Sequence, residues 1–391
     1  MLGVLRWLGA ALVPALLLVW GIYRSDKNRE PIWLVSLTFA LGAVLAAISF
    51  VIETKAAQVS GLDLRAAVAG EAGAVVFIVA LVAPVNEAAK VAAAWPAFRS
   101  RHFDEPYDGL VYSAAAALGF AAAQNAAILR AHPTGWVWLA RAGLSLPAHL
   151  FFASAWGYAL GRAKRLKTPG ALFPLTWFVA TMAHALYAHF VYGRGPGALV
   201  AVAPLLAIMG GITFLFARDL RSRGDGDAPP SSRVSRLSRL TVEGLSRPPS
   251  LTAVRDALRR ADHPIMLRWI VMGALVTVGA MVAGLAASVA FGNWAHVDFA
   301  VVDEHDASTV GPVALLGAGV LAAFPLSGFL VAKASSLPTL LEPTLASALA
   351  ILLALVMLGF AAPLALVFAL AFSPVAWILA CAGAWIGRPS R

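Results

Sequence analysis

The stretch FDEPYDGLVYSAAAALGFAAAQN, from Phe103 to Asn125, decides the class of fold. It begins with charged, turn-forming residues, among which Pro106 suits the first turn of a helix. A long run of small apolar residues follows, and such residues let helices pack closely within a membrane. The run ends on two side-chain amides, Gln124 and Asn125, which lipid cannot solvate. This pattern predicts a membrane span that packs against other helices.

The composition of the whole chain supports this reading. The chain has 391 residues, of which 60% are hydrophobic and 13% are charged. Soluble domains average about 25% charged residues, so this chain lacks the polar surface that a soluble protein needs. We therefore predict an all-α, polytopic transmembrane helical bundle. The single cysteine, Cys381, excludes an internal disulfide framework.

Apolar runs of about 20 residues, the length that crosses a bilayer, predict eleven spans. Their expected positions are 3–23, 31–53, 71–97, 109–130, 137–161, 170–192, 196–217, 266–291, 310–332, 343–361 and 364–387. Only Arg6 precedes the first apolar run, and no small-x-small cleavage site lies before RSDKNRE. We therefore expect the first span to be a retained helix and not a signal peptide.

The basic residues lie mainly in alternate loops between the apolar runs. Segment 218–268 alone has eleven arginines, whereas the loop at 292–309 has neither Lys nor Arg. Because positive loops stay in the cytoplasm, we expect an N-terminus outside and a C-terminus inside a bacterial inner membrane. The net charge of +10 then reflects basic loops that set the orientation of the chain and face the anionic lipid of the bilayer. We expect no nucleic-acid partner.

The charge pattern also divides the chain into three parts. Residues 1–217 form a first membrane region, and 218–265 form a cytoplasmic basic linker that includes a short amphipathic helix starting near Ser250. Composition equally allows a flexible tether in place of that helix. Residues 266–391 form a C-terminal membrane region of about four helices, to which the residues assign no role. The sequence does not give the oligomeric state.

Polar residues within the predicted spans are the candidate functional residues, because placing them in lipid is costly. The string APVNEAAK carries Asn86, Glu87 and Lys90, whose spacing places all three on one face of a helix. The alternative is a structural Glu87–Lys90 ion pair that holds helices together.

Two histidines lie in successive predicted spans, His149 in 137–161 and His184 in 170–192. If both converge with Glu87, they predict a polar cavity within the membrane. A zinc site is disfavoured, because no HExxH motif is present and these histidines lie on different helices. We therefore predict no cofactor. By themselves, Gln124 and Asn125 are typical of hydrogen bonds between helices.

Four motifs in this order resemble the PrsW family of intramembrane proteases. That family is grouped with the CAAX-processing-type (Abi) proteases and the APH-1 subunit of gamma-secretase. Its pattern is EExxK, then FDEPxDGxVYGAxxGLGFAxxEN, then two histidine helices of which the second resembles HALYN. This chain has NEAAK, FDEPYDGLVYSAAAALGFAAAQN, PAHLFFASAWGYALG and HALYA. The resemblance covers residues 30–195.

The resemblance implies a glutamic-type peptidase. A carboxylate of the first motif would activate water, and Lys90 would orient that carboxylate. His149, His184 and the polar groups at Gln124 and Asn125 would position the water and stabilise the oxyanion. The substrate would be a transmembrane or membrane-proximal peptide, typically of an anti-sigma factor.

The chain departs from the family pattern at two glutamates. Asn86 stands where the first glutamate belongs and Gln124 where the second motif has its glutamate, while Ala188 replaces the asparagine after His184. An amide can orient water but cannot accept its proton, so Glu87 is the expected base. The alternative is a catalytically inactive pseudoprotease scaffold that binds transmembrane helices. A transporter is disfavoured, because no inverted repeat is evident.

Overall fold

The computed structural model describes residues 2–60, 72–132, 134–164, 172–193, 195–222, 265–297, 310–335, 340–361 and 363–387. All regular secondary structure in these ranges is helical, which confirms the predicted all-α class. The chain divides into two compact units, Met1–Pro229 (unit 1) and Pro230–Arg391 (unit 2). Most of the predicted basic linker, including its amphipathic helix, lies outside the described residues.

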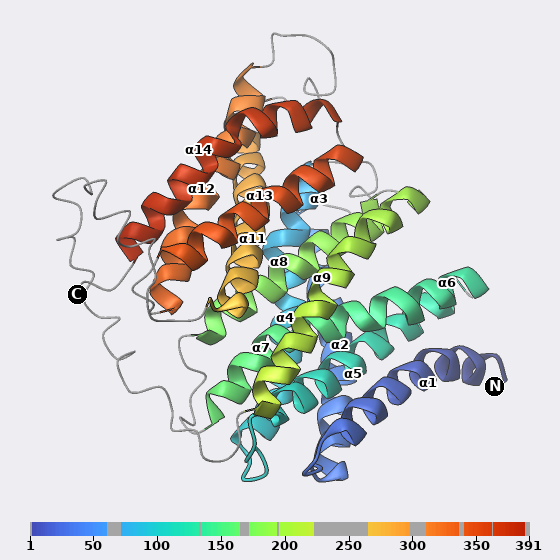
Figure 1. The fold of residues 1–391 in the computed structure, drawn as a ribbon. Helices are drawn as coiled ribbons and strands as arrows, with labels where there is room; N and C mark the ends of the chain where they lie inside the picture. Colours follow the sequence, from blue (N-terminus) through green and yellow to red (C-terminus); the bar gives the residue numbers. More distant parts are fainter. Residues whose placement is uncertain are drawn as a thin grey trace. The chain divides into compact units, whose positions relative to one another are not determined.

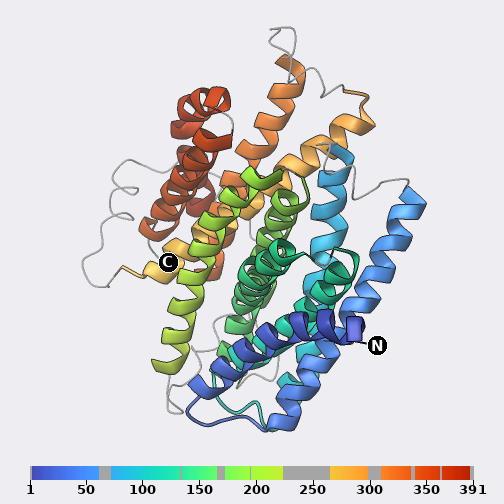
Figure 2. The same ribbon diagram turned by 90° about the vertical axis from the view of Figure 1, so that its right-hand side faces the viewer.

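Unit 1 is a bundle of long helices (Figures 1 and 2). Its elements are α1 (Leu2–Ser25), α2 (Ile32–Ser60), α3 (Ala72–Phe77), η2 (Ile78–Val82), α4 (Ala83–Arg99), α5 (Asp108–Ala131), α6 (Gly135–Ala140), η3 (Arg141–Ser145), α7 (Leu146–Arg162), α8 (Leu172–Gly193) and α9 (Gly195–Ser222). Helix α5, which carries the stretch quoted first, contacts α1, α2, α4 and α7. It is therefore the central helix of the unit.

Small residues let α5 take this central position. A Cβ atom added to Gly119 would lie 2.0 Å from the backbone oxygen of Phe39 on α2. One added to Gly109 would lie 2.2 Å from the backbone oxygen of Gly157 on α7. The helices thus meet backbone to backbone, as small residues allow in membrane bundles.

Two π-helical turns interrupt otherwise continuous rods. In η2 the N–H of Ala83 bonds the oxygen of Ile78, and Pro84 follows; in η3 the N–H of Leu146 bonds the oxygen of Arg141, and Pro147 follows. A proline inside a helix has no N–H to donate, and its ring clashes with the carbonyl four residues earlier. The wider turn accommodates the proline, so α3–η2–α4 and α6–η3–α7 each continue as one rod.

The described residues of unit 2 form four helices, α11 (Leu267–Trp294), α12 (Val310–Ser335), α13 (Leu341–Ala361) and α14 (Pro363–Gly387). Helix α12 packs on α11 and α14, and α13 packs on the same two. Gly284 and Gly319 bring α11 and α12 into backbone contact. Unit 2 is thus a small-residue membrane bundle like unit 1.

Seven of the described helical segments are long and apolar enough to cross a membrane. They correspond to α1, α2, α3–α4, α5, α11, α12 and α14. The other four predicted spans coincide with α6–α7, α8, α9 and α13, which are helical without meeting that criterion over the described residues. The polytopic membrane architecture is therefore confirmed.

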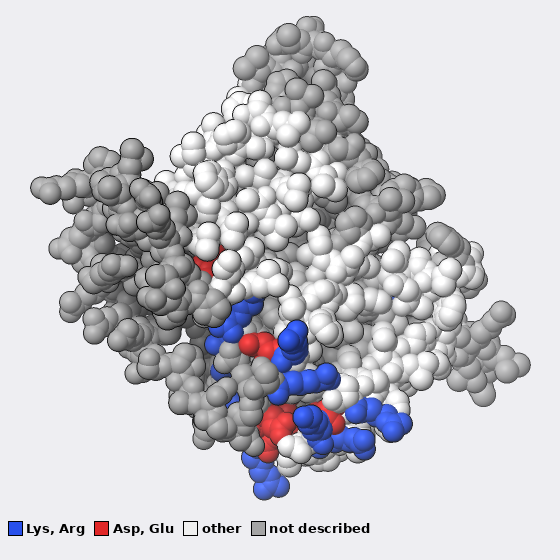
Figure 3. Space-filling view, viewed as in Figure 1, with Lys and Arg blue, Asp and Glu red and all other residues white. Residues whose placement is uncertain are grey.

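Charged side chains gather at one end of unit 1, where the α1–α2 and α4–α5 loops lie (Figure 3). Arg221, near the end of α9, donates hydrogen bonds to the Ser25 oxygen at 3.2 Å and to the Tyr107 hydroxyl at 2.8 Å. These bonds join three segments at the charged end.

Candidate active site

The centre of unit 1 holds a buried ion pair on α4. The side chains of Glu87 and Lys90 are fully buried, and Lys90 Nζ donates to Glu87 Oε1 at 2.5 Å. One turn of helix separates the two residues, so a single α4 face presents both charges to the interior. A buried pair of this kind persists because removing either partner strands the other charge.

Two more helices contribute donors to the same carboxylate. His184 Nδ1 on α8 lies 2.8 Å from Glu87 Oε1, and Trp156 Nε1 on α7 donates to Glu87 Oε2 at 3.2 Å. Both carboxylate oxygens are therefore engaged, and three helices meet at one acid. The sequence did not single out Trp156, because an indole within an apolar helix is indistinguishable from a packing residue.

His149 joins this centre through His184. The two imidazole rings are edge to face, with centroids 5.0 Å apart, and His149 also lies 5.9 Å from the ring of Phe120 on α5. His149 is buried, and its Nδ1 has no hydrogen-bond partner in the described part of the chain. This nitrogen is free to hold a water or a substrate group.

The two amides of α5 differ in their surroundings. Asn125 is buried, accepts a hydrogen bond from Ser145 Oγ at 3.2 Å and donates to the Arg141 oxygen at 3.5 Å. Asn125 thereby fastens α5 to the π-helical turn η3. Gln124 is half-buried, and no hydrogen bond joins it to Glu87 or to either histidine, all of which the structure describes. In this conformation neither amide touches Glu87.

Asn86 faces an acid that sequence reasoning missed. Glu53 on α2 is 7% exposed, and the Asn86 amide is its hydrogen-bonding partner. One oxygen of each side chain, Glu53 Oε1 and Asn86 Oδ1, lacks a partner within the described residues. The predicted span ended at residue 53, which would place this acid at the membrane surface. Because α2 continues to Ser60, Glu53 lies about two turns inside the helix.

The π-helical turns explain how the candidate residues are placed. Asn86 and Glu87 follow η2 by one turn, and His149 follows η3 at the same distance. A π turn rotates the rest of the helix relative to the preceding part, so it sets which face the following residues present. Such turns are frequent at functional sites.

The residues around Glu87 do not form a metal site in this arrangement. Within the described ranges the one group of three acidic or histidine donors with mutual separations below 4.8 Å is Asp26, Glu30 and Asp108, far along α5 from this centre. Glu87 Oε1 already contacts the Lys90 ammonium, and a cation there would meet that positive charge. No step of the reaction proposed below therefore passes through a metal.

Comparisons with known proteins agree with the sequence motifs. Residues 30–214 match the profile of the family described as PrsW family intramembrane metalloprotease. The chain is 33% identical over 164 residues to Protease PrsW of Oceanobacillus iheyensis, covering 40% of this chain and 69% of that protein. It is 31% identical to Protease PrsW of Clostridioides difficile (39% and 64% covered) and 28% identical to that of Bacillus subtilis (40% and 68%). No solved structure matches the chain significantly.

The matched region contains α4, α5, α7 and α8, which are the helices that carry Glu87, Lys90, His149 and His184. All the relatives named above are proteases, and the first is covered over more than two thirds of its length. The chain therefore belongs to the PrsW family of intramembrane proteases.

Proposed function

We propose that this protein is an intramembrane endopeptidase that hydrolyses peptide bonds of membrane proteins. The observation that carries the proposal is the convergence of α4, α7 and α8 on the buried Glu87 carboxylate. An acid, an imidazole and a second imidazole whose Nδ1 has no hydrogen-bond partner among the described residues are the groups that water activation requires. Charged groups are costly in such an interior, which makes a purely incidental cluster unfavourable.

The base in this proposal is the Glu87–His184 pair. The pair takes a proton from water as the hydroxide oxygen attacks the carbonyl carbon of the substrate, and a C–O bond forms. The tetrahedral intermediate then collapses, the C–N bond breaks, and the pair returns the proton to the leaving amine. The Lys90 ammonium keeps Glu87 ionised, and the free Nδ1 of His149 is placed to hydrogen-bond the developing oxyanion.

A membrane-embedded substrate has a place to bind beside this centre. An apolar groove of about 450 Å³ runs between α4 and α8 and is lined by Ala88, Val91, Ala92, Trp95, Phe173 and Trp177. Ala88 directly follows Glu87, and α8 also carries His184. A transmembrane segment packed in this groove would lie next to the reaction centre. An anti-sigma factor is the substrate type that the family resemblance implies.

The test compares purified full-length protein with Glu87→Gln and Glu87→Ala on a candidate single-span substrate in detergent or liposomes. We expect both variants to lose cleavage, because neither side chain can take a proton or stabilise a positive charge on His184. Equal cleavage by wild type and Glu87→Gln, with the same fragments, would remove Glu87 from the mechanism. A parallel incubation with a zinc chelator tests metal dependence, and we expect no loss of cleavage there.

The second candidate function is an inert scaffold that binds transmembrane helices. Asn86 and Gln124 at the positions of family glutamates favour it, as does the full engagement of the Glu87 oxygens. If wild type binds the substrate without cleaving it, and the double variant Asn86→Glu with Gln124→Glu cleaves it, the missing glutamates explain the inactivity of wild type.

We place the protein in a bacterial inner membrane with its N-terminus outside, because the basic loops lie at the charged end of unit 1.

A further inference from the structure

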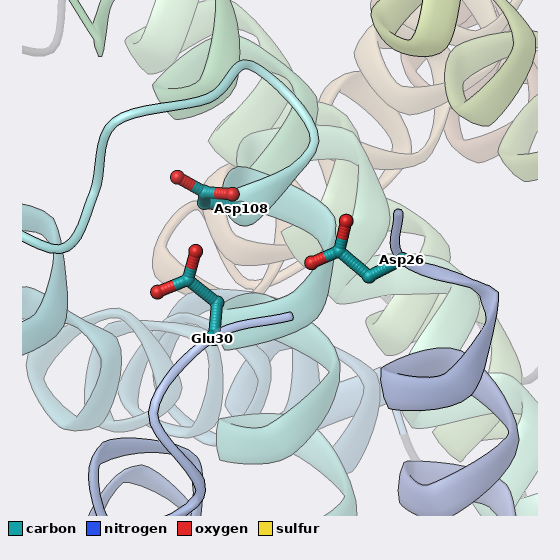
Figure 4. Close-up of side chains that lie close together, drawn as sticks. All are labelled: Asp26, Glu30 and Asp108. Atoms are coloured by element: carbon teal, nitrogen blue, oxygen red, sulfur yellow. The ribbon is translucent and has the colours of Figure 1, made fainter. Parts of the chain in front are cut away.

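Three carboxyl groups converge at the charged end of unit 1, away from Glu87 (Figure 4). Asp26 lies just after α1, Glu30 just before α2, and Asp108 is the first residue of α5. Their nearest oxygens all lie within 4.8 Å of one another. We propose that this acidic cluster is a binding site for a hard divalent cation such as Ca²⁺ or Mg²⁺. The site fastens the α1–α2 loop to the start of the central helix.

The carboxyl groups are buried and incompletely bonded. Asp26 is 5% exposed, Glu30 is 4% and Asp108 is fully buried. Asp26 Oδ2 and Asp108 Oδ1 have no hydrogen-bond partner within the described residues, and Figure 4 shows the three carboxyls turned towards a common gap. A buried carboxylate oxygen without a partner is costly, so these two atoms point to a missing ligand.

In the described part of the chain the cluster makes no ion pair, although the charge of Arg221 acts on Asp26. The Tyr112 hydroxyl donates to Glu30, and the Glu105 N–H donates to Asp108 Oδ2 at 2.6 Å. Both donors are neutral. None of the ion pairs among the described residues involves the cluster, since these pairs join Glu87 with Lys90, Glu87 with His184, and Arg162 with Asp219. Carboxylates this close repel unless a proton or a cation lies between them.

The donor chemistry selects the class of cation. All the donors are oxygens, which suit Ca²⁺ and Mg²⁺, whereas zinc in proteins favours sites with nitrogen and sulfur ligands. Two ligands on opposite sides of Ca²⁺ are about 4.6–5.2 Å apart, and those of Mg²⁺ about 4.0–4.2 Å apart. Three oxygens within 4.8 Å of one another can therefore share one Ca²⁺ ion, and they can share one Mg²⁺ ion where their separations stay below about 4.2 Å. Water completes the coordination.

The site is separate from the reaction centre, so its failure and that of the peptidase proposal are distinguishable. Phe120 on α5 lies beneath Lys90, with the ammonium 5.5 Å from its ring, and Asp108 precedes Phe120 by twelve residues. Twelve residues of α-helix span about 18 Å. Cation binding at Asp108 therefore acts on the packing of α1, α2 and α5 and leaves Glu87 untouched.

The experiment uses full-length protein in detergent, treated with a chelator and then exchanged into chelator-free buffer. Mn²⁺ binding is measured by the loss of the free-ion electron paramagnetic resonance signal, and melting temperatures are recorded in Ca²⁺ and in Mg²⁺. We expect wild type to bind Mn²⁺ with a stoichiometry near one and to melt several degrees higher in millimolar Ca²⁺. Asp26→Asn and Glu30→Gln should each bind at least tenfold more weakly.

The matched control is Asp104→Asn, which removes an exposed acid from the neighbouring loop. It should weaken Mn²⁺ binding less than either cluster variant, because Asp104 acts on Glu30 through its charge and is not a member of the cluster. The proposal is overturned if wild type binds no Mn²⁺, or if Asp26→Asn binds as tightly as Asp104→Asn. It is also overturned if Asp26→Asn melts higher than wild type while no cation changes either protein, because a shared proton then balances the cluster. Asp26 lies in a loop, so this variant tests the site even if Asp108→Asn fails to fold.

Discussion

At the scale of single residues, the reaction centre is defined by how fully Glu87 is bonded. Lys90, Trp156 and His184 all contact its carboxylate, so few lone pairs remain for water. A carboxylate that accepts several charged or aromatic N–H bonds is a weak base by itself. Pairing with His184 solves this problem, since the imidazole can take the proton while Glu87 stabilises the resulting charge.

The Glu87–Lys90 pair gives the first prediction, which concerns stability. Lys90→Met should destabilise the fold by about 3–5 kcal/mol, because it leaves Glu87 without the charge that balances it in the interior. Lys90→Met with Glu87→Gln should recover most of that loss, because no buried charge remains. Thermal melting of both variants in detergent measures the coupling. A double variant less stable than either single variant would mean that the pair is not the source of the cost.

Asn86 gives the second prediction. Asn86→Glu places a second carboxyl beside Glu53, and two adjacent buried carboxylates cannot both ionise. The variant should therefore melt below wild type at neutral pH, and adding Glu53→Gln should restore the melting temperature. The same pair of proteins should be assayed for cleavage. If Asn86→Glu is as stable as wild type at neutral pH, Glu53 does not face residue 86 in the folded protein.

Part of the site could be predicted from the sequence and part could not. Spacing on α4 and the family motifs indicated Glu87, Lys90 and the two histidines, and the structure brings these four together. Spacing could not show which neighbour Asn86 would meet, because that contact depends on α2 extending to Ser60. It also could not show that Gln124 stands apart, since the rotation of α5 depends on its packing partners. The catalytic roles of all these residues stay predictions.

At the scale of elements, α5 is the central helix against which α1, α2, α4 and α7 pack. Its alanines and glycines are buried along most of its length, and α2 and α7 approach its backbone closely. In a membrane such contacts replace the hydrophobic driving force that packs helices in water. The small residues of the opening stretch are therefore needed for structure, independently of any catalytic role.

The third prediction tests this packing. Gly119→Ala should destabilise the protein by about 1–3 kcal/mol, because its Cβ would lie 2.0 Å from the Phe39 oxygen and the backbones must separate. Gly211→Ala on α9 is the control, since nothing lies within 4 Å of that added carbon. It should be neutral or slightly stabilising, as expected for Gly to Ala in a helix. Equal melting temperatures for the two variants would contradict close α2–α5 contact.

The fourth prediction concerns the groove between α4 and α8. Ala92→Trp fills part of this groove with a large ring, so it should reduce cleavage of a membrane substrate at least tenfold without lowering the melting temperature. Ala127→Trp, at an exposed alanine on α5 outside the groove, is the matched control and should retain cleavage. Loss of cleavage in both variants would point to a general effect of added bulk and not to the groove.

The helices themselves were largely predictable, because a stretch of about 20 apolar residues has few alternatives to a membrane helix. Each predicted span overlaps a described helical segment, although α2 extends seven residues beyond the predicted end at residue 53. The two π-helical turns were not predicted. Pro84 and Pro147 indicate a local disturbance, but a kink, a break and a π turn all satisfy a proline, and only packing decides between them.

At the scale of the whole molecule, unit 1 separates its polar groups into two places. One is the enclosed centre around Glu87, and the other is the charged end that holds Asp26, Glu30 and Asp108. The family match covers the helices of unit 1 alone, so the chemistry inferred from relatives belongs to that unit. The carboxyls of the charged end have raised pKa values, so their ionisation couples the stability of the fold to pH.

Asp26 gives the sign of that coupling and the last prediction. Burial, followed by the charge of Glu105, raises the pKa of Asp26 from 3.8 to about 6, against the opposing influence of Arg221. Burial also raises the pKa of Glu30, although Tyr112 opposes the change. An acid with a raised pKa stabilises the fold below its unfolded pKa, and this stability is lost as the pH rises through the folded value.

Chelator-treated protein should therefore melt at progressively lower temperature between pH 4 and about pH 6.5. Asp26→Asn should flatten this dependence, and millimolar Ca²⁺ should oppose it in wild type because the cation replaces the lost protons. A melting temperature that instead rises over this interval in wild type would show that Asp26 is stabilised as the carboxylate by groups of the protein itself.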